Sequence, residues 1–169
     1  KGSSSDNVQS ARGHEAGEEP AAAPQEGQQP EANEFLIHVM EDCLAKIELS
    51  MLSLDNAGSD EVKAFAQSMI DEYGKLGQQI EKMASDMKVP WPKKVRGEHA
   101  SLIRAMKKLT GKEFDQRFIE QNLAQLENDL KVFRHYAQQK DGGPTQTLAR
   151  TGVKLFEKQL KTAREFTLA

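Results

Sequence analysis

Apolar residues recur every three or four positions along most of the chain after residue 34. The clearest repeat runs from Ser59 to Met87, and its spacing is that of one face of a long amphipathic helix. Its apolar positions are Val62, Ala66, Met69, Tyr73, Leu76, Ile80, Met83 and Met87, widened by Phe65 and Ile70. A face this broad suits a bundle core, so the pattern predicts a helix with one buried side.

The same spacing predicts three more long helices and one short helix. The first runs from about residue 32 to Leu54, the short one covers about 98–109, and the last two open at Thr110 and Thr145, whose hydroxyls suit an N-cap. Helix-breaking Gly and Pro residues separate the segments at 56–58, 89–92 and 141–144. The inward positions expected for the first helix are Leu36, Val39, Met40, Cys43, Leu44, Ile47, Met51 and Leu54.

The lengths of the connections predict how these helices are arranged. Tight loops join the first two long helices and the last two, whereas the middle connection is long and holds the short helix. No stretch alternates apolar and polar residues as a sheet requires. We therefore predict an all-α protein, a four-helix bundle with one long crossover, which is the ferritin-like arrangement.

The N-terminal segment has a different composition from the rest. Residues 1–34 contain no Phe, Trp, Tyr, Leu, Ile or Met, and they are rich in Gly, Ser, Pro, Gln and Glu. Such a segment cannot bury enough apolar surface to offset its ordering entropy. The sequence predicts a disordered acidic tail over residues 1–33 and a bundle domain over 34–169.

Charge follows the same division. Residues 1–34 carry a net charge of −5, the whole chain carries −3, and neither value indicates nucleic-acid binding. The segment 88–112 is the exception, with eight cations against Glu98 and a net charge of +7. Such a run is most often a solvated face, but it also suits an anionic membrane surface, the acidic tail or an acidic partner. The cations are Lys88, Lys93, Lys94, Arg96, Arg104, Lys107, Lys108 and Lys112.

The sequence contains no recognisable catalytic motif. No Glu is followed three residues later by His, no two His residues are spaced i, i+4, and no phosphate loop, Gly-x-Ser-x-Gly or Cys-x-x-Cys occurs. We expect the histidines at surface or rim positions and Cys43 to be a buried thiol that packs as a small hydrophobe. We therefore predict no catalytic residue, no cofactor and no enzymatic activity.

Several polar positions and two glycines allow more than one interpretation. The carboxylate pairs 41–42 and 71–72 fall on polar faces and are expected in water. Glu48 lies near the edge of the apolar face, where its carboxylate either reaches water or lies inside the bundle as a polar group. Gly74 and Gly77, spaced i, i+3, indicate either a close helix crossing or a bulge that a ligand approaches.

Three segments resemble the bacterial domain of unknown function 4142. EVKAFAQSMIDEYGKL resembles the family's Val-Lys-x-Phe-Ala-x-x-Met-x-x-Asp-His signature, and KLFEKQLKTA is similar to its Leu-x-x-His-Leu-x-x-Ala ending. LIRAMKKLTGKEFDQRFIEQNL resembles its Gly-x-x-Phe-Asp-x-x-Phe/Tyr block through Gly111, Phe114, Asp115 and Phe118. The resemblance covers about residues 33–166.

This resemblance implies a ferritin-like bundle, usually exported and often found in lipoproteins, for which no activity is established. Relatives often carry a Glu on the first helix and a His on each of the other three long helices. Glu48 matches the Glu, but Tyr73, Leu126 and Gln159 stand where the relatives have His. If those His residues bind metal in relatives, the site is expected to be lost here, so no metal is predicted.

Together these observations predict a non-catalytic bundle of the bacterial periplasm or outer membrane that acts through binding or structure. A lipid anchor on a cysteine preceding Lys1 would explain the start of the chain, with the tail as a spacer, although an artificial N-terminus would look the same. The partner is an unknown protein or another envelope component. The alternatives are a metal-dependent ferritin-like oxidoreductase and a small-ligand or lipid carrier with a cavity beside Gly74 and Gly77.

Overall fold

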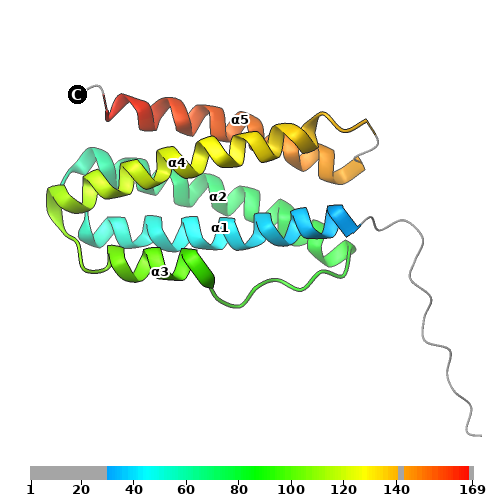
Figure 1. Ribbon diagram of the computed structural model, residues 1–169, viewed down its shortest axis with the longest axis horizontal. Helices are drawn as coiled ribbons and strands as arrows, with labels where there is room; N and C mark the ends of the chain where they lie inside the picture. The colour runs from blue at the N-terminus through cyan, green and yellow to red at the C-terminus, as the bar shows by residue number, and fades with distance from the viewer. Residues whose placement is uncertain (1–29, 141–142, 168–169) are drawn as a thin grey trace, which may run out of the picture.

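The computed structural model describes residues 30–140 and 143–167, and these residues form five helices (Figure 1). The long helices are α1 (Pro30–Asn56), α2 (Asp60–Asp86), α4 (Gly111–Ala137) and α5 (Gly143–Glu165). The short helix α3 (Gly97–Met106) lies in the connection between α2 and α4. Within these ranges the only β contact is an isolated bridge between Ala57 and Gly111.

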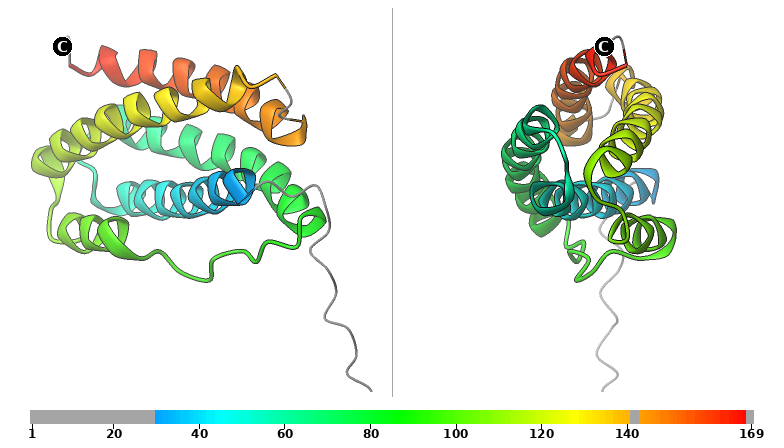
Figure 2. Two further views of the ribbon diagram at one scale, coloured as in Figure 1. Left: turned by 45° about the vertical axis from the view of Figure 1, so that its right-hand side comes forward. Right: turned by 90° about the vertical axis from the view of Figure 1, so that its left-hand side faces the viewer.

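The bundle is built from two helical hairpins. Helix α1 packs chiefly against α2, and α4 packs chiefly against α5. The α2–α4 connection and α3 run along one side of the bundle beside α1, and α5 lies on the opposite side (Figures 1 and 2). The predicted all-α, ferritin-like bundle with a short helix in its long crossover is therefore confirmed.

The helix boundaries differ from the sequence prediction at two N-termini. Helix α1 begins at Pro30, so residues 30–33, which were assigned to the tail, form its first turn; residues 1–29 lie outside the described part. Helix α5 begins before Thr145, whose hydroxyl therefore does not cap it. In both helices a proline stands in the first turn, where it needs no N–H partner.

The caps of α2 and α4 also differ from each other. Ser59 caps α2 as predicted, since its hydroxyl oxygen accepts a hydrogen bond from the Val62 N–H at 3.1 Å. Thr110 precedes α4, but its side chain makes no capping hydrogen bond, so the cap predicted for its hydroxyl does not form. Gly111, with φ of +61°, adopts the left-handed conformation at this helix start.

The family motif around Asp115 holds the α1–α2 turn to the start of α4. The Asp115 carboxylate accepts hydrogen bonds from the Gly58 and Ser59 N–H groups, each at 2.9 Å. A Cβ on Gly58 would lie 2.8 Å from the Gly111 backbone, so the turn tolerates no side chain there. Phe114 and Phe118 are fully buried one helical turn apart. These motif residues therefore serve the fold.

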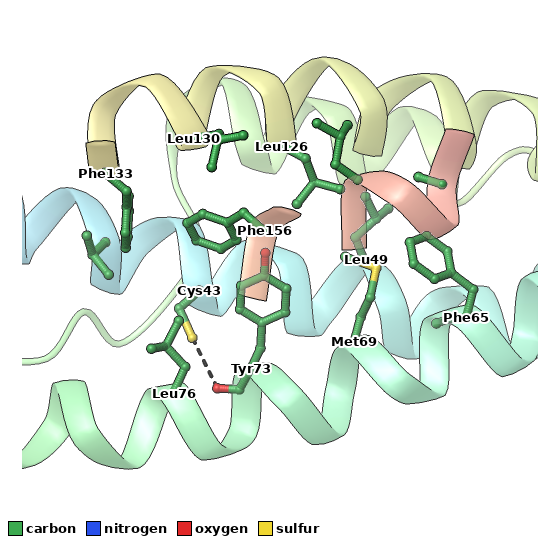
Figure 3. Close-up of a cluster of buried hydrophobic side chains, with 14 of the residues drawn as sticks. Cys43, Leu49, Phe65, Met69, Tyr73, Leu76, Leu126, Leu130, Phe133 and Phe156 are labelled. Carbon is green, nitrogen blue, oxygen red and sulfur yellow. Dashed lines mark hydrogen bonds between the residues drawn. The ribbon is translucent and has the colours of Figure 1, made fainter. Parts of the chain in front are cut away.

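Aromatic and aliphatic side chains from all four long helices fill the interior. Figure 3 shows Tyr73 from α2 pointing toward Phe156 and Leu126, with Phe133 of α4 beside them. The Phe133 and Phe156 rings meet edge to face with centroids 4.6 Å apart. Tyr73, Leu126 and Phe156 are each at most 1% exposed, so this part of the core excludes water.

The glycines of α2 do not mark a close helix crossing. A Cβ built on Gly74 would meet no atom within 4 Å, and one on Gly77 would make an ordinary 3.7 Å contact with the Cys43 sulfur. The close approach occurs instead at Gly152 of α5, where a Cβ would lie 2.3 Å from the Phe133 ring. Gly152 thus allows α5 to pack against α4.

We predict that Gly152→Ala lowers the free energy of unfolding by about 1–3 kcal/mol, because the Phe133 ring is enclosed and cannot move aside. Gly74→Ala is the matched control, and it should raise the free energy by up to about 1 kcal/mol through helix propensity alone. Urea denaturation followed by circular dichroism measures both. Equal stability of the two variants would contradict this account of Gly152.

Candidate functional site

Lys46 of α1 is buried in the bundle, and its ammonium group contacts two buried carboxylates. Asp42, one turn earlier on the same helix, has its Oδ2 3.1 Å from Lys46 Nζ. Asp129 of α4 accepts a short hydrogen bond from the same nitrogen. Lys46, Asp42 and Asp129 are only 5%, 4% and 1% exposed, so their charges depend on one another for compensation.

Two aromatic rings complete the surroundings of the ammonium group. Lys46 Nζ lies 5.2 Å from the centroid of the Tyr73 ring and 5.0 Å from that of Phe156. Both distances fall in the range of cation–π attraction. Each long helix therefore contributes one side chain to this centre: Lys46 from α1, Tyr73 from α2, Asp129 from α4 and Phe156 from α5. We call these four residues and Asp42 the Lys46 cluster.

Asp42 connects the Lys46 cluster to the side of the bundle that α3 covers. Its Oδ1 accepts a hydrogen bond from Gln125 Nε2 at 2.9 Å, and His99 Nε2 lies 3.7 Å away. A cavity of about 20 Å³ beside Lys46 is lined by His99, Asn122 and Gln125 among others. This volume accommodates a water molecule at most. The cluster is therefore close to the surface but has no room for an organic substrate.

Two buried polar atoms near the bundle centre have no hydrogen-bond partner. They are Asp129 Oδ1 and Gln159 Oε1. The Gln159 amide nitrogen donates to Glu72 at 2.9 Å, so only its oxygen is unpaired. Unpaired buried polar atoms are rare in folded proteins because each has lost its hydration. Their concentration here marks the centre as a site that apolar packing alone does not explain.

The pKa values of the cluster diverge. Burial, reinforced by the charge of Asp42, raises the pKa of Asp129 to about 7 despite the nearby ammonium. Burial also opposes ionisation of Asp42, but Lys46 and a hydrogen bond with Asp129 outweigh it and lower the Asp42 pKa. Burial acts against the charge on Lys46, yet the carboxylates hold its pKa well above the usual value. Below about pH 7 the neutral arrangement is Asp42 carboxylate, Lys46 ammonium and protonated Asp129.

The positions at which the family resemblance led us to expect Glu or His lie mostly at this centre. Tyr73, Leu126 and Gln159 are buried, and Leu126 and Gln159 lie one turn from Asp129 and Phe156 respectively. Glu48 is exposed, which agrees with its interpretation as a solvated flank position. Lys46 takes the inward place on α1 instead, because two residues rotate a helix by about 200°.

Sequence reasoning placed Leu36, Val39, Met40 and Cys43 correctly in the core, but it missed the cluster because it assigned the wrong face of α1 after Cys43. Asp42 was expected in water and is buried, while Met51 was expected in the core and is 56% exposed. The buried residues that follow this spacing are Leu36, Val39, Cys43, Lys46, Ser50, Ser53 and Ala57. Lys46, Ser50 and Ser53 are polar, so the second half of the buried face is mostly polar. The spacing of three or four residues, continued beyond Cys43, leads to Lys46. A search for apolar residues alone passes over this position because it is a lysine.

The Lys46 cluster does not fit a metal of the kind that ferritin-like bundles hold. Such sites need carboxylate and His ligands that converge on an open centre. In the described ranges no group of three His, Cys, Asp or Glu side chains is placed to hold a metal ion, and His38 and His135 are exposed. The ammonium group of Lys46 already contacts both core carboxylates.

Cys43 is a buried thiol beside the cluster, as predicted. It is 2% exposed, and its sulfur donates a weak hydrogen bond to the Tyr73 carbonyl at 3.5 Å (Figure 3). Burial, together with the charge on Asp42, raises its pKa to about 12. Because the thiolate is the reactive form, this environment suits packing and disfavours nucleophilic chemistry.

The basic crossover, defined by the eight cations between Lys88 and Lys112, is a second candidate site. All eight side chains are exposed, and none forms an ion pair with a described carboxylate. On the opposite side of the bundle, Arg134 is paired with Glu157 at 3.0 Å and Arg164 with Glu127 at 3.5 Å. Trp91 lies partly buried against the core and fixes the crossover to the bundle.

Fold and site together define a ferritin-like four-helix bundle whose centre holds an internal ion cluster. Residues 17–166 match the family described as domain of unknown function (DUF4142), and the chain belongs to this family. The match confirms the family predicted from the sequence motifs, and it begins inside the segment predicted as the tail.

A search of solved structures gives a similarity in fold. The crystal structure of a DUF305 fragment from Deinococcus radiodurans matches with a TM-score of 0.72 and 14% identity, over 82% of this chain and 95% of that one. At this identity the likeness concerns the fold alone. No curated protein matches the chain. None of the described helices is long and apolar enough to cross a membrane.

We predict that Asp129→Asn changes the pH dependence of stability. The folded pKa of Asp129, about 7, exceeds the ordinary value of 3.8, so its stabilising contribution is full below about pH 4 and is lost as pH rises to about 7. The unfolding free energy of wild type minus that of the variant should therefore fall by about 1 kcal/mol per pH unit over this interval.

Urea denaturation at a series of pH values measures this difference. Asp71→Asn, which replaces an exposed carboxylate of α2, is the control and should show the wild-type profile. A difference between wild type and Asp129→Asn that stays constant from pH 4 to 7 would show that Asp129 ionises normally in the folded protein.

Proposed function

We propose that this domain is a non-catalytic component of the bacterial cell envelope that docks on an anionic membrane surface through its basic crossover. The observation that carries the proposal is the set of eight exposed, unpaired cations, of which seven lie on one connection and its short helix and Lys112 lies in the first turn of α4. Each cation near an anionic lipid surface contributes about 1 kcal/mol. A few of them acting together therefore suffice for reversible attachment.

The placement of the cations supports a surface that engages one partner face. The crossover and α3 run along the same side of the bundle beside α1 (Figures 1 and 2). Within that segment Glu98 is the one acidic residue, and Glu48 of α1 lies beside Lys94 and Lys107 without forming an ion pair. A cation-rich side with so few carboxylates is complementary to anionic headgroups.

The chemistry of the core supports the absence of catalysis in this proposal. The raised pKa of Lys46 keeps its amine protonated, and the raised pKa of the Cys43 thiol keeps it un-ionised, so neither is available as a nucleophile. The oxidoreductase alternative requires a metal at the bundle centre, but the Lys46 ammonium group already contacts the carboxylates there. The carrier alternative requires a cavity beside Gly74 and Gly77. Gly74 faces open space and Gly77 packs on Cys43, so neither glycine lines an internal cavity.

Location in the envelope is part of the proposal. It rests on the expectation that members of this family are usually exported. Fractionation of cells that express the native gene tests it directly. Recovery of the protein in the periplasmic or outer-membrane fraction is the expected result. Recovery in the cytoplasmic fraction would show that the proposed location is wrong. The docking surface would still be tested separately by vesicle binding.

We predict that the protein binds vesicles of phosphatidylcholine and phosphatidylglycerol at low salt, and does not bind vesicles of phosphatidylcholine alone. A variant with Lys93→Glu, Lys94→Glu, Lys107→Glu and Lys108→Glu should bind at least about tenfold more weakly, since each of the four cations contributes about 1 kcal/mol. Vesicle co-sedimentation over a range of salt concentrations measures both, because screening weakens such attraction.

The matched control changes charge equally on other faces. Lys82→Glu, Lys131→Glu, Lys154→Glu and Lys161→Glu alter four exposed lysines of α2, α4 and α5, and this variant should retain most of the binding. If both variants lost vesicle binding equally, binding would depend on net charge alone, and the proposal of a defined docking surface would be wrong. Tighter binding to duplex DNA than to the anionic vesicles would assign the crossover to a nucleic-acid partner instead.

A further inference from the structure

The Lys46 cluster occupies the place at which bundles of this architecture hold metal ions. Those sites lie in the core, with ligands that project inward from facing helices. Here the inward groups are the carboxylates of Asp42 and Asp129 and the ring of Tyr73, contributed by α1, α4 and α2. Between them lies one cation, the Lys46 ammonium group, carried by the chain itself.

The contacts of this ammonium group resemble those of a bound cation. It contacts an oxygen of each carboxylate, and it lies within about 5 Å of the Tyr73 and Phe156 ring centroids. A further polar atom, Asp129 Oδ1, belongs to a side chain that is 1% exposed and has no hydrogen-bond partner. The centre therefore offers more oxygen atoms than the ammonium group uses.

We propose that Lys46 is an internal cation that takes the place of a metal and closes an otherwise cation-binding core to divalent ions. Removal of its side chain leaves the buried Asp42 carboxylate, and above about pH 7 that of Asp129 as well, without a counter-charge, which is strongly unfavourable. Oxygen ligands of this kind suit hard divalent ions such as Mn²⁺. A core that lacks Lys46 should therefore take up such an ion, whereas the native core does not need one.

The competing explanation is an ordinary buried ion pair with no relation to metal binding. It shares one expectation with the proposal, a loss of stability when Lys46 is removed. The two differ in what restores stability. An ordinary ion pair is repaired only by neutralising the carboxylates, whereas the core proposed here is also repaired by a divalent ion that binds them.

The test compares wild type, Lys46→Ala and Lys46→Met after treatment with EDTA, with and without an excess of Mn²⁺. Lys46→Met keeps much of the side-chain volume and removes only the charge. We expect the Tm of wild type to be unchanged by Mn²⁺, and that of the folded Lys46 variants to rise by about 5 °C or more. Electron paramagnetic resonance should count about one bound Mn²⁺ per variant chain, an estimate that follows from a single pair of core carboxylates.

Two controls assign the response to the core carboxylates. Lys161→Ala removes an exposed lysine of α5 and should behave as wild type. Lys46→Ala combined with Asp129→Asn should lose both the Tm rise and the bound Mn²⁺. If Lys46→Ala does not fold in EDTA, Mn²⁺ should restore its helical circular dichroism, and failure to do so would overturn the proposal.

Two other outcomes would also overturn the proposal. In the first, wild type binds stoichiometric Mn²⁺ in an Asp129-dependent way, which would mean that Lys46 does not exclude divalent ions. In the second, folded Lys46→Met gains no Mn²⁺ response, which would leave the cluster as an ordinary ion pair. Neither outcome bears on vesicle binding by the basic crossover, because Lys46 is buried and the crossover cations are exposed.

Discussion

The contact between the Lys46 ammonium group and Asp129 joins the two halves of this bundle. Helices α1 and α2 form one hairpin and α4 and α5 the other, and each hairpin packs mainly within itself. Between them run a few polar links: Lys46 and Asp42 of α1 reach Asp129 and Gln125 of α4, while Glu72 of α2 reaches Gln159 and Lys158 of α5. Apolar packing tolerates small shifts of one hairpin along the other, but a buried charge that loses its partner does not. The cluster therefore fixes the register of the hairpins.

A second constraint acts at one end of the bundle and depends on backbone rather than charge. Asp115 accepts both N–H groups of the α1–α2 turn, and the turn lies so close to Gly111 that Gly58 cannot carry a side chain. Asn56 adds a hydrogen bond to the Leu109 carbonyl at 3.0 Å. Residues that carry the family resemblance, Gly111, Phe114, Asp115 and Phe118, thus explain the shared fold. They say nothing about a shared activity.

The sequence predicted the architecture well because it is encoded locally. Apolar spacing and helix-breaking residues such as Pro90 and Pro92 determine the helices, and the lengths of the connections determine which helices are neighbours. The centre could not be predicted in the same way. A template that rewards apolar residues chose Leu44, Ile47 and Met51 on α1 and so rotated the helix away from Lys46. Only tertiary pairing with Asp129, 83 residues later, makes a buried lysine tolerable, and no local pattern reports such a partner.

The same argument explains why the core is polar close to apolar residues. Leu126 is a fully buried apolar side chain, yet Asp129 on the next turn of α4 directs a carboxylate inward. If Lys46 were apolar, that carboxylate would be unpaired and the bundle less stable. Lys46 supplies the positive charge from within the chain, so the core retains its polar character without an external ion. Because this cation belongs to the chain itself, the ion pair that joins the two hairpins can form as the chain folds.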